Sequence, residues 1–378
     1  MTARNYIEGK IKLKTALHCA TPDDYHVNAA GYVTAGKAPP GTGGVIATMQ
    51  MPIIADGLRH TIPYFPANDV RGRLRRKSAK IMLDALTKQG PVSVELYAGL
   101  SAGAVSASPE GSEITVEEVL RAKGNVYMGI FGGGTRMLRS AYRVQDIVPV
   151  IGSTVKAGMV PERIANPTGA KSIVPTVRGK AAEGEEGEQS RAEITGIHQI
   201  SHVYRAIRID DVARVMRVDE LETYLADAEK EVTQYQSKVL EGRKAKKDSK
   251  ETGEEVKKAD IGNMMAFQGI APGVDMYFRL DFADDLTEGQ IGMLIQSLCD
   301  LVNEQALGGW VRTGLGQYDA SELELCIDGE ARKLFTVAGD GSYEISETLK
   351  PYIDQMRTEL SALTAADMME FFTTKKAA

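Results

Sequence analysis

The sequence predicts an α+β fold, and three patterns support this prediction. A strand pattern over residues 6–17 is followed, after a long irregular stretch, by a helical pattern that begins near Val70. Near the C-terminal end, a strand over 274–282 precedes a helix over 285–305, which is expected to be capped by Thr287 or Asp285. A glycine-rich loop and a strand follow within 308–327. Alternation with a period of two indicates strands, and apolar spacings of three and four indicate helices. Two such β-α units separated by insertions are typical of a ferredoxin-like sheet.

The composition is typical of a soluble globular protein. The 378 residues are 43% hydrophobic and 25% charged, with a formal net charge of −6, so overall charge does not indicate a nucleic-acid binder. No run of about 18 apolar residues occurs, and "MTARNYIEGK" lacks the apolar centre of a signal peptide. The three cysteines form no CxxC pair, which fits a reducing compartment. We therefore expect a cytoplasmic protein with no membrane contact.

The first strand is expected to have a basic outer face. Within 6–17, the apolar Ile11 and Leu13 alternate with Lys10 and Lys12. Alternate residues of a strand point to opposite sides of a sheet, so the apolar side should face a core and the lysine side solvent.

A helix is predicted behind the proline-containing stretch "IPYFPAND". Its apolar residues recur at spacings of four and seven and should face a core: Val70, Leu74, Ile81 and Ala85. Asn68 or Asp69 is expected to accept the first free backbone amides of the helix.

The polar side of this helix carries charges of one sign. Four cations precede the first carboxylate on that side, Asp84: Arg73, Arg76, Lys77 and Lys80. A solvated helix normally mixes signs, so the cluster indicates either an ordinary solvated face or a bound anion. Because Arg73 and Arg76 lie off the apolar stripe, their replacement is expected to leave the core intact.

A second basic element follows a predicted helix over 113–123. The segment "GNVYMGIFGGGTRMLRSAYRVQDIVPV" predicts a strand, a glycine loop and a basic element, and between Leu120 and Gln145 there are five basic residues and no acid. Beyond it, residues 151–200 form a long excursion with an acidic tip, of a length typical of a functional projection or a linker. A strand is predicted over 201–215, and the Lys- and Glu-rich segment 216–262 predicts a solvated helical insertion.

The sequence lacks the fingerprints of common cofactor and metal sites. Neither GxxxxGK followed by Ser or Thr, nor GxGxxG after a strand, occurs, which argues against ATP-dependent and dinucleotide-dependent enzymes. His198 and His202 are spaced like zinc ligands, but the intervening glutamate of a zincin is missing. His18 and Cys19 are neighbours on a strand and should point to opposite faces. We expect no cofactor and no metal.

Two loops remain as candidates for chemistry or binding. Asp23 and Asp24, in "TPDDYH", could hold a metal or assist strand cleavage, but together with Pro22 they also have the chemistry of a turn, which we favour. The glycines of 308–316 bracket Arg312, an arrangement in which bare backbone amides and a guanidinium can approach phosphates closely.

Three motifs resemble the RAMP superfamily of CRISPR proteins. "LHCATPDD" followed by "IPYFPANDVRGRLRR" is similar to the strand, loop and helix of that superfamily. "IFGGGTRMLRSAY" is similar to the glycine-loop element of its Cas-seven-type backbone subunits, and "GGWVRTGLGQ" resembles the C-terminal glycine-rich loop. The motifs occur in family order across nearly the whole chain, and the details resemble type IV systems. The chain departs from the family where Tyr64 to Ala67 replace a glycine and a small residue.

The resemblance implies a ferredoxin-like, RRM-related palm with long insertions, namely a finger-like helical part and a thumb β-hairpin. The corresponding divisions are 1–150 for the first half of the palm with the basic helix, 151–200 for the thumb-like hairpin, 201–215 for a palm strand, 216–262 for the charged helical insertion and 263–378 for the second half of the palm with the glycine-rich loop and C-terminal helix.

The resemblance also implies a non-catalytic subunit that polymerises along a CRISPR guide RNA. Its partners would be the guide RNA, neighbouring copies, other effector-complex subunits and the target nucleic acid paired to the guide. The residues that we expect to bind RNA are Arg71, Arg73, Arg75, Arg76, Lys77, Gly132, Gly133, Gly134, Arg136, Arg139, Arg143, Lys156, Lys171, Arg178, Arg312, Gly314 and Gly316.

Two enzymatic alternatives stay open at this point. A metal-dependent nuclease would use Asp23 and Asp24 to cut RNA paired to the guide, as the type III relatives do with an aspartate in this loop. A guide-processing endoribonuclease of the same superfamily would use His18 or His26 as a base. Neither is expected for a type IV backbone subunit.

Overall fold

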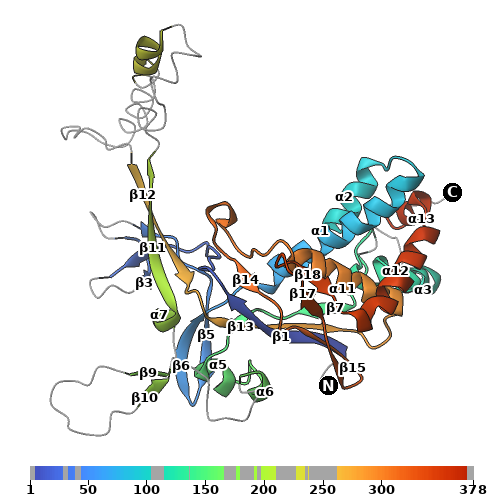
Figure 1. The fold of residues 1–378 in the computed structure, drawn as a ribbon, viewed down its shortest axis with the longest axis horizontal. Coiled ribbons are helices and arrows are strands. Elements are labelled where there is room, and N and C mark those ends of the chain that lie inside the picture. The colour runs from blue at the N-terminus through green and yellow to red at the C-terminus, as the bar shows by residue number, and fades with distance from the viewer. Residues whose placement is uncertain are drawn as a thin grey trace. The chain divides into compact units, whose positions relative to one another are not determined.

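The computed structural model describes residues 5–28, 33–38, 44–103, 115–135, 137–165, 176–178, 191–193, 197–209, 227–234, 237 and 262–372. The chain divides into two compact units (Figure 1). The first comprises residues 1–23, 47–202 and 269–378, and the second comprises 24–46 and 203–268. The chain therefore leaves the first unit twice and returns to it twice.

An antiparallel sheet forms the centre of the first unit. Its strands lie in the order β16 (Glu330–Lys333), β15 (Glu324–Ile327), β1 (Asn5–Leu13), β13 (Asp275–Phe282) and β7 (Tyr142–Val144), with β14 (Tyr318–Asp319) on β1 and β8 (Val148–Pro149) on β13. The longest register pairs β1 with β13, from Asn5 opposite Phe282 to Lys12 opposite Asp275. The strands predicted over 6–17 and 274–282 are confirmed, although the first ends at Leu13.

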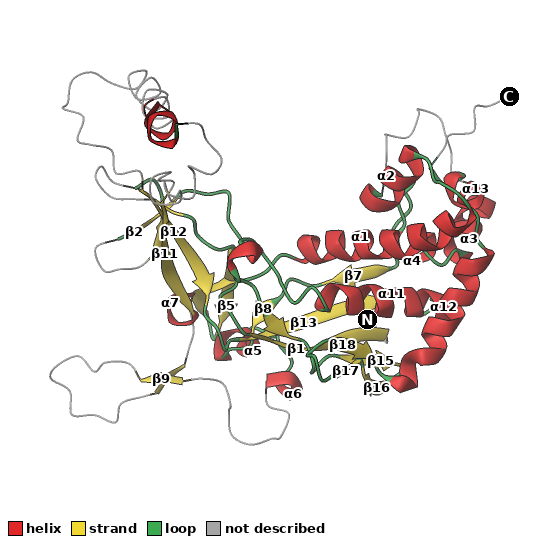
Figure 2. Cartoon of the chain, turned by 45° about the horizontal axis from the view of Figure 1, so that its top comes forward, coloured by secondary structure: helices red, strands yellow, loops and turns green. Residues whose placement is uncertain are grey.

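One face of this sheet packs against helices. The core joins alternate residues of β1 and β13 with apolar residues of α1 (Ala67–Leu86) and α11 (Glu288–Val302). The residues are Ile7, Ile11, Leu13, Leu74, Phe278, Leu280, Leu294 and Leu298. Figure 2 shows α1 and α11 beside the strands that they cover. The apolar face formed by alternate strand residues and the apolar stripe of α1 thus pack together in one core.

The apolar stripe of α1 is confirmed, but its predicted cap is wrong. Val70 and Leu74 are buried, whereas Ile81 and Ala85 are partly buried at the edge of the same core. The helix begins behind Pro66, and no side chain of its own first turn caps it. Asp146 accepts from the Ala67 amide instead, at 2.8 Å, because the chain returns there after 79 residues, which local spacing does not reveal.

The second long helix, α11, begins at the predicted cap. Thr287 and Gln290 form a capping box, in which the side-chain oxygen of each residue accepts from the backbone amide of the other. The hydroxyl oxygens of Ser297 on α11 and Ser78 on α1 lie 2.5 Å apart in the interior. On its other side α11 packs closely on α12 (Lys350–Ala362), since a Cβ at Gly292 would lie 2.1 Å from the Tyr352 carbonyl oxygen.

Of three smaller helices, the sequence predicted one. The helix expected over 113–123 is α3 (Val116–Gly124), which begins with a capping box at Thr115. The strand predicted within 124–131 is wrong, because Met128–Phe131 form the helical turn α4. Its residues Met128, Ile130 and Phe131 are all buried, and a short apolar run that is buried on every side shows neither period. The helix α2 (Val94–Ala102) was not anticipated.

The remaining described elements of the first unit are β5 (Gln50–Ala55), β6 (Leu58–Pro63), η1 (Thr87–Gln89), α5 (Gly152–Lys156), α6 (Glu162–Ala165), β9 (Thr176–Arg178), β10 (Arg191–Glu193), α7 (Ile197–Ile200), η2 (Val311–Thr313), β17 (Phe335–Val337), β18 (Tyr343–Ile345), η3 (Glu347–Leu349) and α13 (Ala365–Met369). β9 and β10 pair antiparallel, within the segment 151–200 in which a hairpin was predicted.

The second unit contains a small sheet in the order β3 (Val33–Ala35), β2 (Tyr25–Val27) and β4 (Gly44–Val45). It also holds most of the paired strands β11 (Ser201–Ile209) and β12 (Gly262–Ile270). The predicted strand over 201–215 corresponds to β11. Of the predicted helical insertion, residues 228–234 are helical, and most of 216–262 lies outside the described residues.

Gly292→Ala should lower the free energy of unfolding by about 2 kcal/mol or more, because the new methyl group meets the backbone of α12. Gly289→Ala, in the same helix, is the control. The atoms nearest to its Cβ would be those of the Glu359 carboxylate, at 2.5 Å, and this flexible side chain can move away. Urea unfolding monitored by circular dichroism measures both changes, and equal losses would contradict the close packing of α11 on α12.

Candidate nucleic-acid interface

A basic groove of about 700 Å³ lies between α1 and the loop that follows α11. It is lined by Arg73, Arg76, Lys77, Lys80, Glu304, Ala306 and Val311. Four cations therefore face one carboxylate. The groove brings the basic cluster predicted on the helix beside the glycine-rich loop predicted at 308–316, which lies more than 200 residues later in the chain.

Arg73 fixes the loop to the helix. Its Nη1 donates to the Ala306 carbonyl oxygen at 2.7 Å, and its Nε pairs with Asp69 at 3.0 Å. The side chain is only 19% exposed. Arg73 lies off the apolar stripe, as predicted, but its replacement is expected to lower stability, because a guanidinium that joins the helix to the loop is part of the scaffold.

Glu304 occupies the groove as an internal anion. One of its carboxylate oxygens pairs with Lys77 Nζ at 2.5 Å, and the other lies 3.9 Å from Arg73 Nη1. Both cations are thus partly neutralised by the protein itself. A phosphate that enters the groove must compete with this carboxylate for Lys77.

Arg76 and Lys80 are the cations most available to a ligand. Both are exposed, and in the described part of the chain Arg76 makes no ion pair. Lys80 pairs with Asp84 at 2.8 Å, four residues along the helix, and such an exposed pair contributes little to stability. These two side chains can therefore bind phosphates at the cost of one exposed ion pair at most.

The glycines of the loop serve two different purposes. A Cβ at Gly316 would lie 1.8 Å from the Leu307 carbonyl oxygen, and one at Gly308 would lie 2.3 Å from the His18 carbonyl oxygen. Gly314 has a φ of 84°, but no atom lies within 4 Å of its Cβ position. Gly308 and Gly316 thus pack against the protein's own backbone, while Gly314 leaves open space. The exposed Arg312 lies between them in η2.

The second predicted loop, Gly132 to Gly134, is packed within the first unit. All three glycines have positive φ angles, and a Cβ on any of them would meet backbone oxygens of Leu138, Gly103 or Phe371 within 2.5 Å. This packing explains the glycines without a ligand.

Arg75 ties α1 to this loop. It donates to the carbonyl oxygens of Phe131 and Gly132, at 3.2 Å for Gly132, and its guanidinium lies 5.8 Å from the centre of the Phe131 ring. Its donors are therefore used inside the protein.

The other predicted RNA-binding residues lie apart from the groove-lining set. Arg71 and Arg139 are exposed, and Lys156 pairs with Asp56 at 2.9 Å. Arg136 and Lys171 lie outside the described residues. Only the backbone of Arg178 is described, in β9 opposite Arg191.

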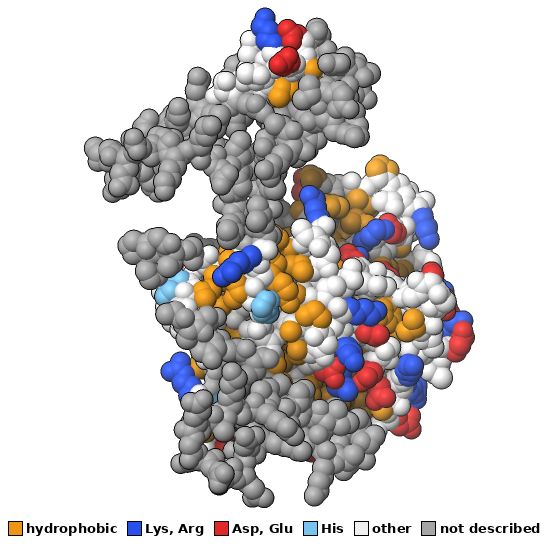
Figure 3. Space-filling model, turned by 60° about the vertical axis from the view of Figure 1, so that its left-hand side comes forward, with side chains coloured by type: hydrophobic (Ala, Val, Ile, Leu, Met, Phe, Trp, Pro, Cys, Tyr) orange, Lys and Arg blue, Asp and Glu red, His pale blue; other side chains and the backbone are white. Residues whose placement is uncertain are grey.

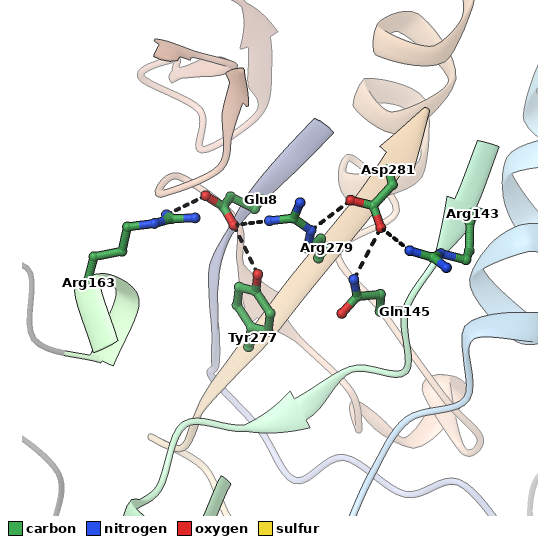
Figure 4. A network of polar contacts seen from close by, with 7 residues as sticks. All are labelled: Glu8, Arg143, Gln145, Arg163, Tyr277, Arg279 and Asp281. Carbon is green, nitrogen blue, oxygen red and sulfur yellow. Dashed lines mark hydrogen bonds and ion pairs between the residues drawn. The ribbon is translucent and has the colours of Figure 1, made fainter. Parts of the chain in front are cut away.

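Arg143 belongs to a polar network on the other face of the central sheet (Figure 4). Asp281, whose side chain is 7% exposed, accepts from Arg279 at 2.7 Å and from Gln145 and Arg143 at 3.1 Å. Burial alone would raise the pKa of Asp281, but these hydrogen bonds hold it below its ordinary value. The carboxylate therefore stays ionised and bound at neutral pH.

Glu8 is the second centre of this network. It accepts from the Tyr277 hydroxyl and from Arg279 Nη1, each at 2.9 Å, and it pairs with Arg163 of α6. Its side chain is 6% exposed. Arg279 thus bridges two buried carboxylates. Local spacing does not predict this network, because its members come from β1, β7 and the residue after it, α6 and β13.

The candidate catalytic residues do not form a recognisable active site among the described residues. Asp23 is exposed and accepts from the Thr21 hydroxyl at 3.3 Å, as in a turn, and Asp24 is exposed beside it. Burial raises the pKa of the Cys19 thiol to about 11, so it is not an activated nucleophile at neutral pH. His26 Nδ1 lies 3.1 Å from the Gly36 carbonyl oxygen. The described residues include no group of three or more His, Cys, Asp or Glu side chains that could hold a metal.

Surface charge is mixed on the face that Figure 3 shows. On the face in Figure 3, Lys and Arg lie beside Asp and Glu over much of the described surface, next to an area of hydrophobic side chains.

The residues that the structure describes contain no helix of the length and apolarity that a membrane crossing requires.

No protein-family model and no curated protein matches the sequence. Among solved structures, the chain is similar to a chain of a "Type IV-B CRISPR Complex", with 13% identity, a TM-score of 0.41 and coverage of 85% of this chain and 90% of that chain. It is also similar to a chain of the "Type III-B Cmr-beta bound to cognate target RNA", with 10% identity, a TM-score of 0.32 and coverage of 86% of this chain and 61% of that chain.

Glu304→Gln should raise the affinity of the groove for inorganic polyphosphate by about fivefold, the equivalent of one surface ion pair of about 1 kcal/mol. The substitution frees Lys77 from its 2.5 Å contact. Glu347→Gln is the control, because it removes the same charge from a lysine, Lys350, at 2.6 Å but does not line the groove. Isothermal titration calorimetry measures both, and equal affinities would show that Glu304 does not restrain Lys77.

Proposed function

We propose that this chain is a non-catalytic RNA-binding backbone subunit of a type IV-like CRISPR effector complex, with the guide RNA, further copies of itself, other subunits and the guide-paired target as partners. The observation that supports this most directly is the groove in which Arg76 and Lys80 face the glycine-rich loop. Cations of this kind neutralise phosphates and release counterions without reading bases. Such binding suits a subunit that must accept any guide sequence, since base pairing then supplies recognition.

The sheet topology supports a ferredoxin-like palm. Along the chain, β1, β7, β13 and β15 are the first, second, third and fourth strands of the palm. In the antiparallel sheet they lie in the order β15-β1-β13-β7, so the spatial order is fourth, first, third, second. Helix α1 lies between β1 and β7 in the sequence, and α11 lies between β13 and β15. This is the β-α-β-β-α-β order of the ferredoxin-like fold. The β9–β10 hairpin is the proposed thumb.

The proposed absence of catalysis rests on the chemistry of the first loop. Asp23 and Asp24 are exposed in a turn that includes Thr21. Cleavage assisted by a metal needs convergent ligands, and cleavage by acid and base needs a positioned proton donor or acceptor.

The protein purified from cells that supply a guide RNA should carry RNA and elute as a multimer. The absorbance ratio and a sized RNA on a gel measure this. A monomer free of nucleic acid would contradict the proposal.

Replacement of Arg76 and Lys80 together by Ala should weaken RNA binding by about tenfold and lower the salt dependence of log K by up to about 1.4, or about 0.7 for each lost phosphate contact with a single strand. The matched control replaces Lys88 and Arg357, one lysine and one arginine that are exposed but do not line this groove. Fluorescence anisotropy at several salt concentrations gives both quantities. If both double variants lost the same RNA affinity, the groove would be an ordinary solvated surface and not an RNA-binding site.

Replacement of Asp23 and Asp24 together by Ala should leave guide and target binding unchanged, and neither protein should cut target RNA. A turn carboxylate contributes about 1 kcal/mol at most, whereas a catalytic one is worth orders of magnitude in rate. The assay mixes the guide-loaded complex with labelled complementary RNA and magnesium. Cleavage by the wild type that the double variant loses would make the chain a nuclease.

A further inference from the structure

A second groove, of about 690 Å³, lies beside the C-terminal half of α1. Its apolar lining comes from α1 and α12, namely Ile81, Ala85, Met356 and Leu360. Asp84 of α1 and Asp300 of α11 add carboxylates to the lining. Lys80, which lines the basic groove, lies about one helical turn before Asp84. The two grooves therefore follow each other along the same helix.

Asp300 is a partly buried carboxylate of the second groove. It accepts from the Gln296 side-chain amide at 2.9 Å. Within the described ranges it forms no ion pair, whereas Asp84 pairs with Lys80 at 2.8 Å. Burial raises the pKa of Asp300, although the nearby charges of Lys77 and Lys80 oppose this rise. A cation that entered the groove would therefore stabilise the ionised form of Asp300.

Helix α3 presents apolar residues to solvent, whereas a surface helix normally turns them toward the core. Ala122 is buried, while Val116 and Leu120 are 76% and 63% exposed. Lys123 is exposed on the same side, because positions i, i+4 and i+7 share one face of a helix. Val116, Leu120 and Lys123 thus form an exposed row, which we call the α3 stripe.

The helix that carries the α3 stripe is fixed to the rest of the first unit. It begins with the capping box at Thr115, and Arg121 pairs with Glu370, which follows α13. Lys123 pairs with Asp285 at 3.1 Å, but both of these side chains are exposed, so the pair contributes little stability. The stripe is therefore preorganised for a partner, and its lysine can exchange one carboxylate for another.

The second groove and the α3 stripe are complementary in apolar surface and in charge. The groove offers an apolar lining and the Asp300 carboxylate, and the stripe offers two apolar side chains and a lysine at helical spacing, as in the docking of a helix in a groove. We propose that the α3 stripe of one copy docks in the second groove of another copy, with Lys123 beside Asp300. The inference rests on the proposed function for the choice of a second copy as the partner.

This contact joins two different surfaces of the chain. Every pair of copies therefore keeps a free groove on one member and a free stripe on the other, so that further copies can add in the same direction. Because the second groove follows the basic groove along α1, the docked helix of the neighbour would lie beside the basic groove. The contact itself involves no RNA, so it is expected in the free protein.

The test uses the full chain, freed of RNA by high salt and nuclease, in sedimentation velocity over a range of protein concentrations. The wild type should self-associate. Leu120→Glu should weaken the association about tenfold or more, because it places a charge against the apolar lining, and Asp300→Asn should weaken it about fivefold. Val94→Glu is the control, because it changes an exposed apolar residue of α2 outside the stripe, and it should associate as the wild type does.

A mixture of two variants tests the direction of the contact. Leu120→Glu retains the second groove, whereas Ser361→Trp fills the groove and retains the stripe. Both positions are exposed, so both variants should keep the melting temperature of the wild type. Each variant alone should be monomeric, and an equimolar mixture should form a heterodimer that does not grow further.

The results for docking and for RNA binding are separable. A wild type that is monomeric at every concentration would overturn the docking inference, and so would self-association that Leu120→Glu and Ser361→Trp leave unchanged. Leu120→Glu should bind a short RNA as tightly as the wild type, since Leu120 does not line the basic groove. If the protein assembles as expected but its RNA affinity does not depend on Arg76 and Lys80, the docking inference stands and the proposed RNA-binding groove is wrong.

Discussion

The hydrogen bond from Arg73 to the Ala306 carbonyl oxygen is the contact on which the groove depends. It joins α1, from the first β-α unit, to the loop behind α11, from the second, at 2.7 Å. The same guanidinium pairs with Asp69 at the start of its own helix, so its direction is fixed from both ends. Because the helix and the loop are held at this separation, the exposed Arg76 and Lys80 of the helix and the exposed Arg312 of the loop are presented by a common scaffold.

The arginines of α1 divide into two groups by what they contact. Arg73 and Arg75 donate to backbone carbonyl oxygens of the two glycine loops, whereas Arg76 points to solvent. A guanidinium has five donors in a fixed plane and is well suited to several carbonyl oxygens at once. Some arginines of this helix therefore hold the structure together, and others lie on the surface, although all are within a few residues of one another. Only the arginines on the surface are free to contribute to ligand binding.

Sequence patterns revealed the features that depend on local spacing. The stripe of Val70 and Leu74, the cap at Thr287 and the strand 274–282 all follow from periods or caps within a few residues. Local spacing did not distinguish the roles of Arg73 and Arg76. The carbonyl oxygen that Arg73 contacts belongs to Ala306, which lies more than 200 positions further along the chain and also lines the groove. The glycines at 132–134 were expected near a ligand, yet they approach the protein's own backbone. The sequence can indicate that a glycine adopts a positive φ, because this is a local property. It cannot indicate which group packs against that glycine, because this depends on the tertiary structure.

The polar network on the sheet has a consequence for how this fold can meet RNA. Many RNA-recognition motifs stack bases on aromatic residues of the open sheet face. Here Tyr6 lies under the Arg279 guanidinium at 4.0 Å, and the Tyr277 hydroxyl donates to Glu8. A base that entered this face would have to displace charge-assisted hydrogen bonds and bring phosphates near two buried carboxylates. The network thus makes this sheet face unsuited to base stacking, and the RNA contacts proposed above involve α1 and the loop behind α11 instead.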